Sequence, residues 1–291
     1  MDKKKNKVLV PVDYSEVSTA AIEHAIIYAK KTNAELNLLN VIEKRPVFIG
    51  RNKEYENKLI EEGAISKLKQ IAADIETKHN IEVEIIVVPG NIFDTINSVA
   101  HEISADFVVM GTHGLSGWQY LFGSNALKVI YHSTVPYILT QKRAPIKGDF
   151  DNILFPIDIH RETVQKTSWA IYFHKIFGST INILEPTEPD EYRAKKIAYN
   201  LSYVKRAFTR HNVDFVVHKS DLDVSSLAEE TNRFAEELSA NLIMIMIYPS
   251  KGTGEFFLTP IQQNVISNKA QIPVVCINPG TVFMLEDNIE I

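Results

Sequence analysis

The sequence predicts an α/β protein built from two consecutive domains, each a doubly wound parallel sheet of five strands. The chain has 291 residues, which is more than a single core usually organises. Short β-branched runs alternate with longer segments of helical spacing, the pattern of successive βαβ units. Blocks of the first half also recur in the second half in the same order, which indicates a duplication.

The repeat starts with KVLVPVDYS at 7–15, which matches NILFPIDIH at 152–160 and places Asp13 opposite Asp158. Further blocks follow in the same order: 36–39 with 181–184, 79–83 with 211–215, 104–109 with 239–244, and 134–138 with 271–275. The offset changes between blocks, so insertions fall in the loops and helix ends that tolerate them. These matches divide the chain into domains at 1–146 and 147–291.

The elements of the first half can be placed in order. The β-branched runs predict strands at 7–12, 35–41, 83–88, 106–110 and 135–140. Ser15 or Ser18 caps the first helix, whose apolar residues recur at helical spacing: Ala21, Ile22, Ala25, Ile26 and Ala29. Later helices are expected at 54–78, 92–103 and 125–132. Ligands of such sheets bind at the carboxyl ends of the strands.

Composition narrows the class of protein. With 45% hydrophobic and 23% charged residues, the chain is an ordinary globular one. Its single cysteine, Cys276, excludes an internal disulfide and a cysteine-rich metal site, which favours a reducing cytoplasm. A net charge of −5 offers no basic footprint for nucleic acid, and the longest apolar run, 242–248, is too short to span a membrane. We expect a cytoplasmic protein that binds neither nucleic acid nor membranes.

A glycine-rich segment follows the fourth strand of the first half. Residues 111–124 read GTHGLSGWQYLFGS and run directly into the next predicted helix. Glycine lets backbone amides approach a phosphate, and a helix N-terminus offers unpaired N–H groups with a favourable dipole. The segment therefore predicts a phosphate site, with a tight turn as the alternative. Its candidate residues are Gly111, Gly114, Gly123, Ser124 and Asn125.

Two further candidates lie at the same edge of the predicted sheet. Asp13 follows the first strand, where its carboxylate can accept a hydrogen bond from a nucleotide; capping the next helix is an equally good interpretation. Val41 follows the second strand and would form an apolar wall, as an apolar strand end does in any case. The predicted site has no metal ligands and no catalytic residue.

These residues together resemble the universal stress protein family. The resemblance rests on VPVDYS at 10–15, MGTHG at 110–114, GSNALKVI at 123–130 and the strand after 135–136, and it covers essentially the whole chain. It implies Rossmann-like domains of the adenine nucleotide alpha-hydrolase type, joined as a pseudo-dimer. It also implies ATP, with or without Mg²⁺. Eight residues separate Gly114 from Gly123, one fewer than in the family's ATP-binding members.

Carried over position by position, the resemblance gives each candidate residue a role. Asp13 and Val41 would meet adenine. Gly111 and Gly114 would lie along the ribose and phosphates. The phosphates would be held by Gly123, Ser124 and Asn125.

The second half keeps the pattern of strands and helices but loses the glycines. Aligned through its last block, Tyr248 stands opposite Gly111, and Pro260 with Ile261 stands opposite Gly123 with Ser124. A proline lacks the backbone donor, and an isoleucine lacks the hydroxyl, that a phosphate would use. Asp158 is then expected to order or cap its own loop. We expect at most one nucleotide per chain.

Three functions stay open on the sequence. The first is a cytoplasmic stress-response regulator that binds ATP in its first domain and signals to an unknown protein partner. The second is an adaptor or scaffold of the same fold that binds no nucleotide. The third is a slow ATP hydrolase in which Asp13 or His113 handles a water molecule. The sequence contains neither an HExxH pair nor a Gly-x-Ser-x-Gly elbow, so turnover is expected to be weak at most.

The duplication also predicts how the halves join. The fifth strands, at 135–140 and 272–278, would lie at sheet edges, and open apolar edges invite pairing. We expect an antiparallel contact between them within the chain that buries Tyr137 and Cys276. A homodimer of whole chains through another surface stays open. Expressed alone, residues 1–146 would self-associate through the exposed fifth strand.

Overall fold

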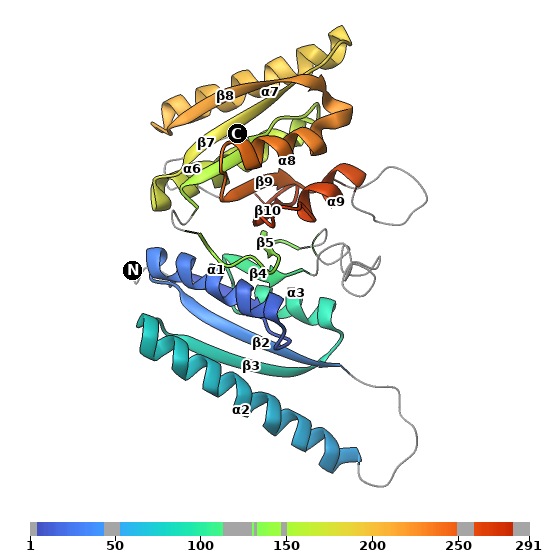
Figure 1. Ribbon diagram of the computed structural model, residues 1–291. Helices are drawn as coiled ribbons and strands as arrows, with labels where there is room; N and C mark the ends of the chain where they lie inside the picture. Colours follow the sequence, from blue (N-terminus) through green and yellow to red (C-terminus); the bar gives the residue numbers. More distant parts are fainter. Residues whose placement is uncertain are drawn as a thin grey trace.

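The structure is a computed structural model that describes residues 5–43, 53–112, 130, 133–146, 150–248 and 259–281. Within these residues, ten strands form one sheet in the order β3-β2-β1-β4-β5-β10-β9-β6-β7-β8. Each half of the chain contributes five neighbouring strands, and Figure 1 shows the two halves following one another along the sheet. The predicted α/β class and pseudo-dimer are confirmed.

The first half follows the predicted order of elements. Its strands are β1 (Lys7–Pro11), β2 (Glu35–Glu43), β3 (Val83–Gly90), β4 (Phe107–Gly111) and β5 (Tyr137–Thr140). Its described helices are α1 (Glu16–Thr32), α2 (Lys53–His79) and α3 (Ile92–Glu102). Most of the helix expected at 125–132 lies outside the described residues.

The second half repeats this order. Its strands are β6 (Asn152–Pro156), β7 (Thr180–Thr187), β8 (Phe215–Asp223), β9 (Leu242–Met246) and β10 (Val274–Ile277). Its helices are α6 (Thr167–Phe177), α7 (Glu191–Arg210), α8 (Leu227–Glu237) and α9 (Pro260–Ile266), with 3₁₀ turns η1 (Arg161–Lys166) and η2 (Val224–Ser226).

Helix α1 begins at a side-chain cap. Ser15 has an extended backbone and accepts a hydrogen bond from the Ser18 amide, so Ser15 is the cap of the two predicted serines. The predicted apolar stripe from Ala21 to Ala29 is buried. The helix ends at Asn33, which adopts the left-handed conformation that closes many helices.

The two faces of the sheet carry separate hydrophobic cores. Successive residues of a strand point to opposite faces, and Val8 and Val10 accordingly join one core while Leu9 joins the other. Helices α1, α2, α6 and α7 cover the first face, and α3, α8 and α9 cover the second. The sheet therefore sits between two helical layers, and its carboxyl edges are left for loops.

The halves join through their fifth strands. β5 and β10 run antiparallel, with Tyr137 opposite Cys276 and Ile138 opposite Val275. Tyr137 and Cys276 are fully buried, and the Tyr137 hydroxyl donates to Asn97 Oδ1 at 2.7 Å. Pairing hides two edges that would otherwise be open. The predicted intrachain contact is confirmed.

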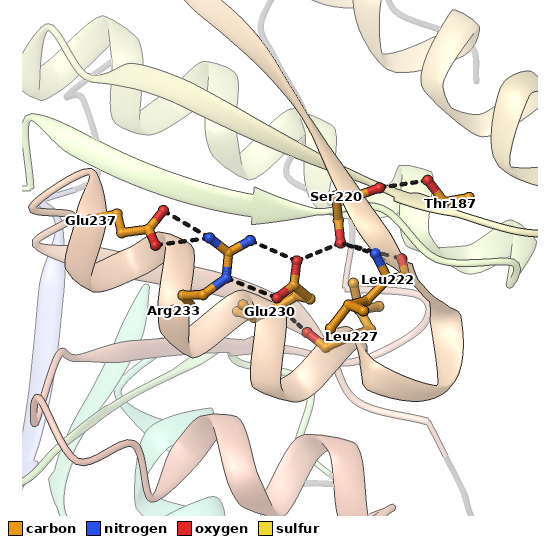
Figure 2. Close-up of polar contacts among 8 residues, drawn as sticks. Thr187, Ser220, Leu222, Leu227, Glu230, Arg233 and Glu237 are labelled. Atoms are coloured by element: carbon orange, nitrogen blue, oxygen red, sulfur yellow. Dashed lines mark hydrogen bonds and ion pairs between the residues drawn. The ribbon is translucent and has the colours of Figure 1, made fainter.

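An ionic network attaches α8 to β8, as Figure 2 shows. The carboxylate of Glu230, with 4% of its side chain exposed, accepts from Arg233 Nε at 2.9 Å and from the hydroxyl of Ser220. Arg233 also contacts Glu237 at 2.8 Å. Hydrogen bonds from Arg233 hold the pKa of Glu230 below its ordinary value although burial acts against them. The network holds α8 in place, and Leu227 and Thr231 of this helix line a cavity in the second half of the chain.

Acid should remove the contribution of Glu230 to stability. Because the folded pKa lies below the unfolded value of about 4.3, this contribution is complete above that value and is lost as the pH falls through the folded pKa. Urea unfolding should show Glu230→Gln less stable than wild type at pH 7, with the difference shrinking below about pH 4. Exposed Glu229→Gln is the control. A difference that stays constant with pH would contradict the assignment.

Candidate functional site

The carboxyl edge of the first sheet half brings three predicted site residues together. β1 lies between β2 and β4, so the chain reverses its winding direction beside β1, where doubly wound sheets bind ligands. Asp13 follows β1, Val41 lies near the end of β2, and Gly111 ends β4. The other predicted residues lie outside the described part of the chain: Gly114, Gly123, Ser124 and Asn125.

The carboxylate of Asp13 orders the loop after β1. Its Oδ1 accepts from the Ser15 amide at 3.0 Å and from the Ser15 hydroxyl at 2.6 Å. Tyr14 between them has a φ of 64°, a conformation that a non-glycine residue adopts only when its surroundings hold it. Asp13 is exposed. Asp13 therefore orders its own loop through Ser15. It does so while it stays exposed at the surface of the predicted site.

Gly111 is required by the packing of β4 against α1. A Cβ at this position would lie 2.6 Å from the carbonyl oxygen of Val17 and 2.8 Å from its side chain, closer than real atoms approach. The next residue, Thr112, is buried and donates to the Thr140 carbonyl from its amide at 2.6 Å and its hydroxyl at 3.0 Å. The chain therefore enters the glycine segment from a fixed position.

Val41 forms part of the apolar wall at this edge. It pairs with Val88 of β3 and packs, half-buried, against the core of the second face. Val41 is therefore an apolar residue near the end of a strand. This position agrees both with an apolar wall of the predicted site and with an ordinary strand end.

The equivalent edge of the second half contains a cavity of about 280 Å³. It lies at the carboxyl ends of β6 and β9 and beneath α8 and α9. Its polar residues include Asp158, His160, Lys166, Arg193 and Tyr248, and its apolar walls include Leu227, Ile245, Met246, Ile261 and Val265. Asp158 Oδ1 accepts from the His160 amide at 2.7 Å, which confirms that Asp158 orders its own loop.

The predicted equivalence of Tyr248 and Gly111 is wrong. Leu9 of β1 pairs with Val108, and the matching Leu154 of β6 pairs with Ile243. Counting forward along β9 puts Met246, not Tyr248, opposite Gly111. The alignment used the offset between the fifth strands of the two halves. That offset does not apply to the fourth strands, β4 and β9, because the segments between the fourth and fifth strands differ in length.

Helix α9 uses its own first-turn groups for capping. Thr259 and Gln262 form a capping box: the Thr259 hydroxyl accepts from the Gln262 amide at 3.3 Å, and Gln262 Oε1 accepts from the Thr259 amide at 2.9 Å. A proline stands in the first turn and contributes no donor. This helix start therefore has fewer free amides for a phosphate than an uncapped one.

Sequence reasoning missed Lys166 as a cavity residue. Lys166 stands three and four residues before Trp169 and Ala170, which both lie on the buried side of α6. This helical spacing is the sequence signal that could have indicated that Lys166 is buried. The side chain is 1% exposed, its Nζ donates to the Pro156 carbonyl at 2.5 Å, and it lies 4.4 Å from the Phe155 ring centre. A lysine is almost never this buried without a specific reason.

Two classes of site receive no support from the described residues. Within those ranges, no group of three or more histidine, cysteine, aspartate or glutamate side chains could hold a metal ion. None of the helices there is both long and apolar enough to cross a membrane.

The comparisons with known proteins agree on one family. The model of the universal stress protein family matches residues 5–141. Universal stress protein MJ0531 of Methanocaldococcus jannaschii is 35% identical over 144 residues, which cover 47% of this chain and 82% of the relative. Universal stress protein MJ0577 of the same organism is 30% identical over 155 residues, covering 47% and 95%.

A solved structure extends the likeness to the second half. A universal stress protein from Archaeoglobus fulgidus aligns with 96% of this chain and 100% of its own, with a TM-score of 0.77 and 21% sequence identity, which supports a shared fold. The two relatives from Methanocaldococcus jannaschii decide the family, because they are 35% and 30% identical to this chain and 82% and 95% of their lengths are covered. The chain is a member of the universal stress protein family.

Proposed function

We propose that the protein is a stress-response regulator that binds ATP in its first half and changes its affinity for a protein partner with occupancy. The observation that carries the proposal is the asymmetry between the halves. The family model matches 5–141, the half with the glycine segment. In the second half, Met246 replaces Gly111 and the start of α9 is capped by its own side chains.

The described residues fit an adenine nucleotide at the first carboxyl edge. Asp13 is exposed there, Val41 supplies an apolar wall for a base, and Gly111 fixes the start of the glycine segment. Gly114, Gly123, Ser124 and Asn125 would hold the ribose and phosphates through backbone amides and a hydroxyl. Mg²⁺ would come with the nucleotide. We propose turnover far below the usual enzyme range of roughly 1–1000 per second, because the proposal includes no positioned base or arginine.

Asp13→Asn should weaken ATP binding at least about tenfold, or about 1.4 kcal/mol, in calorimetric titration. The asparagine oxygen can still accept from Ser15, so the loop keeps its order while the charge and the second acceptor are lost. Thermal unfolding should therefore change little. This separates the nucleotide role of Asp13 from its structural one.

The matched control is Asp158→Asn, the same change at the repeated position, which should leave ATP affinity unaltered. Equal affinity of Asp13→Asn and wild type would contradict the adenine role of Asp13. If wild type itself shows neither heat nor a thermal shift with ATP, the adaptor function that binds no nucleotide replaces the regulator.

A further inference from the structure

Lys166 is a buried amine without a close counter-ion in the described structure. Its one hydrogen bond there goes to a backbone carbonyl, that of Pro156, and the carboxylate of Asp158 acts on it only at longer range. Burying an ammonium group costs several kcal/mol even in real proteins. Burial accordingly lowers the pKa of Lys166 to about 8, against the raising effect of Asp158. A far larger fraction of this amine is neutral at pH 7 than of an ordinary lysine.

Lys166 belongs to the lining of the cavity in the second half. Lys166, Pro156 and Asp158 all line the cavity of about 280 Å³. Tyr248, which also lines the cavity, packs on the His160 ring with 4.5 Å between ring centres. Opposite these polar groups lie Leu227, Ile245 and Val265. The space thus has one polar end and an apolar body.

The polar end is balanced in charge. Arg193 pairs with Glu188 at 3.2 Å, and the nearby acid Asp158 offsets the charge of Lys166 without forming an ion pair with it. Burial raises the pKa of Asp158 despite Lys166 and the His160 amide, so this acid holds a proton more readily than an exposed one. A ligand with a neutral polar head and an apolar tail fits this end better than an ion, because it adds no unbalanced charge.

We propose that the second half captures small apolar aldehydes or ketones as an imine on Lys166, with Asp158 as the acid. Lysines desolvated in apolar pockets are the ones that form such adducts with carbonyl compounds. The site lies apart from the nucleotide edge, and the proposal is independent of ATP binding.

The step balances without an oxidant or reductant. The lone pair of Lys166 Nζ attacks the carbonyl carbon, and the carbonyl oxygen takes the proton of Asp158. The Asp158 carboxylate then removes a proton from the nitrogen of the adduct and returns it to the hydroxyl, which leaves as water. The product is the protonated imine, which joins Nζ to the former carbonyl carbon, and Asp158 is left as the carboxylate. The apolar walls hold the alkyl group.

Reductive trapping tests the proposal on the full chain. The protein is incubated with butanal and sodium cyanoborohydride at pH 7, and peptide mass spectrometry follows the butyl label at each lysine over time. Lys166 should be labelled at least about tenfold faster than Lys142 and Lys195, whose side chains are 63% and 72% exposed. Butanamide, of the same shape but not electrophilic, should slow labelling at Lys166 and leave the exposed lysines unchanged.

Two variants complete the design. Lys166→Arg keeps the positive charge and should abolish the fast label. Asp158→Asn should slow labelling of Lys166 at least about tenfold, a modest effect for a general acid, while the exposed lysines serve as internal controls. Labelling of wild-type Lys166 no faster than of the exposed lysines would overturn the proposal, whatever the stability of the variants. An unchanged rate in Asp158→Asn would overturn the role of the acid.

Discussion

Replacing Phe107 with alanine should destabilise the chain by about 3–5 kcal/mol, the usual cost of removing a buried phenylalanine. Phe107 starts β4 and is 0% exposed. Its ring centre lies 5.2 Å from that of Tyr28 in α1 and 4.9 and 5.7 Å from those of Trp169 and Phe173 in α6. One side chain therefore contacts aromatic rings of both halves. Truncation leaves a cavity where the halves meet.

Urea unfolding followed by tryptophan fluorescence and circular dichroism measures this loss. Phe215→Ala is the matched control, because Phe215 is only partly buried on the outermost strand β8 and packs on Phe208 within its own half. The control should cost less. A loss below about 1 kcal/mol for Phe107→Ala, far under the range for buried phenylalanine, would show that the aromatic contact between the halves contributes little.

Gly111→Ala should cost about 1–3 kcal/mol, the range for overpacking a filled core. The new methyl carbon would lie 2.6 Å from the Val17 carbonyl oxygen. Because this atom is backbone in the first turn of α1, the helix start or the end of β4 must shift. The shift would also displace the Asp13 loop, which Ser15 joins to the same helix, so ATP affinity should fall with stability.

Gly63→Ala is the control, and it should change the stability of the chain in the opposite direction. Gly63 lies in α2, and nothing stands within 4 Å of an added Cβ. Alanine is favoured over glycine by about 0.8–1 kcal/mol in a helix interior, so this variant should gain stability in the same urea titration. Equal stability of Gly111→Ala and wild type would show that β4 and α1 are not packed as tightly as described.

The duplication made the fold predictable from sequence, because matched blocks fix the order of strands and leave the fifth strands to pair. The register of β9 was not predictable in the same way. An offset taken from the last strand fails across the segment before it, and it put Tyr248 where the sheet places Met246. The site was predictable only as positions on strand ends. Asp13 and Gly111 were found by pattern, whereas their contacts with Ser15 and Val17 depend on the tertiary fold.

Lys166 shows the other limit of the sequence. A lysine in a polar stretch before a helix suggests a solvated residue. Its helical spacing to Trp169 and Ala170 is a weak signal for burial, and the contacts of Lys166 with Phe155 and Pro156 depend on how the fold places the η1 segment. Patterns shared by the halves could not reveal the inward position of this lysine.

The division of function between the halves is tested most directly by the stoichiometry of ATP binding to the full chain, measured by calorimetric titration with Mg²⁺ present. We expect one site per chain, located in the first half, that is weakened by Asp13→Asn and unaffected by Asp158→Asn. A stoichiometry of two would contradict the division of function between the halves, and the absence of any binding would contradict a nucleotide site in the first half.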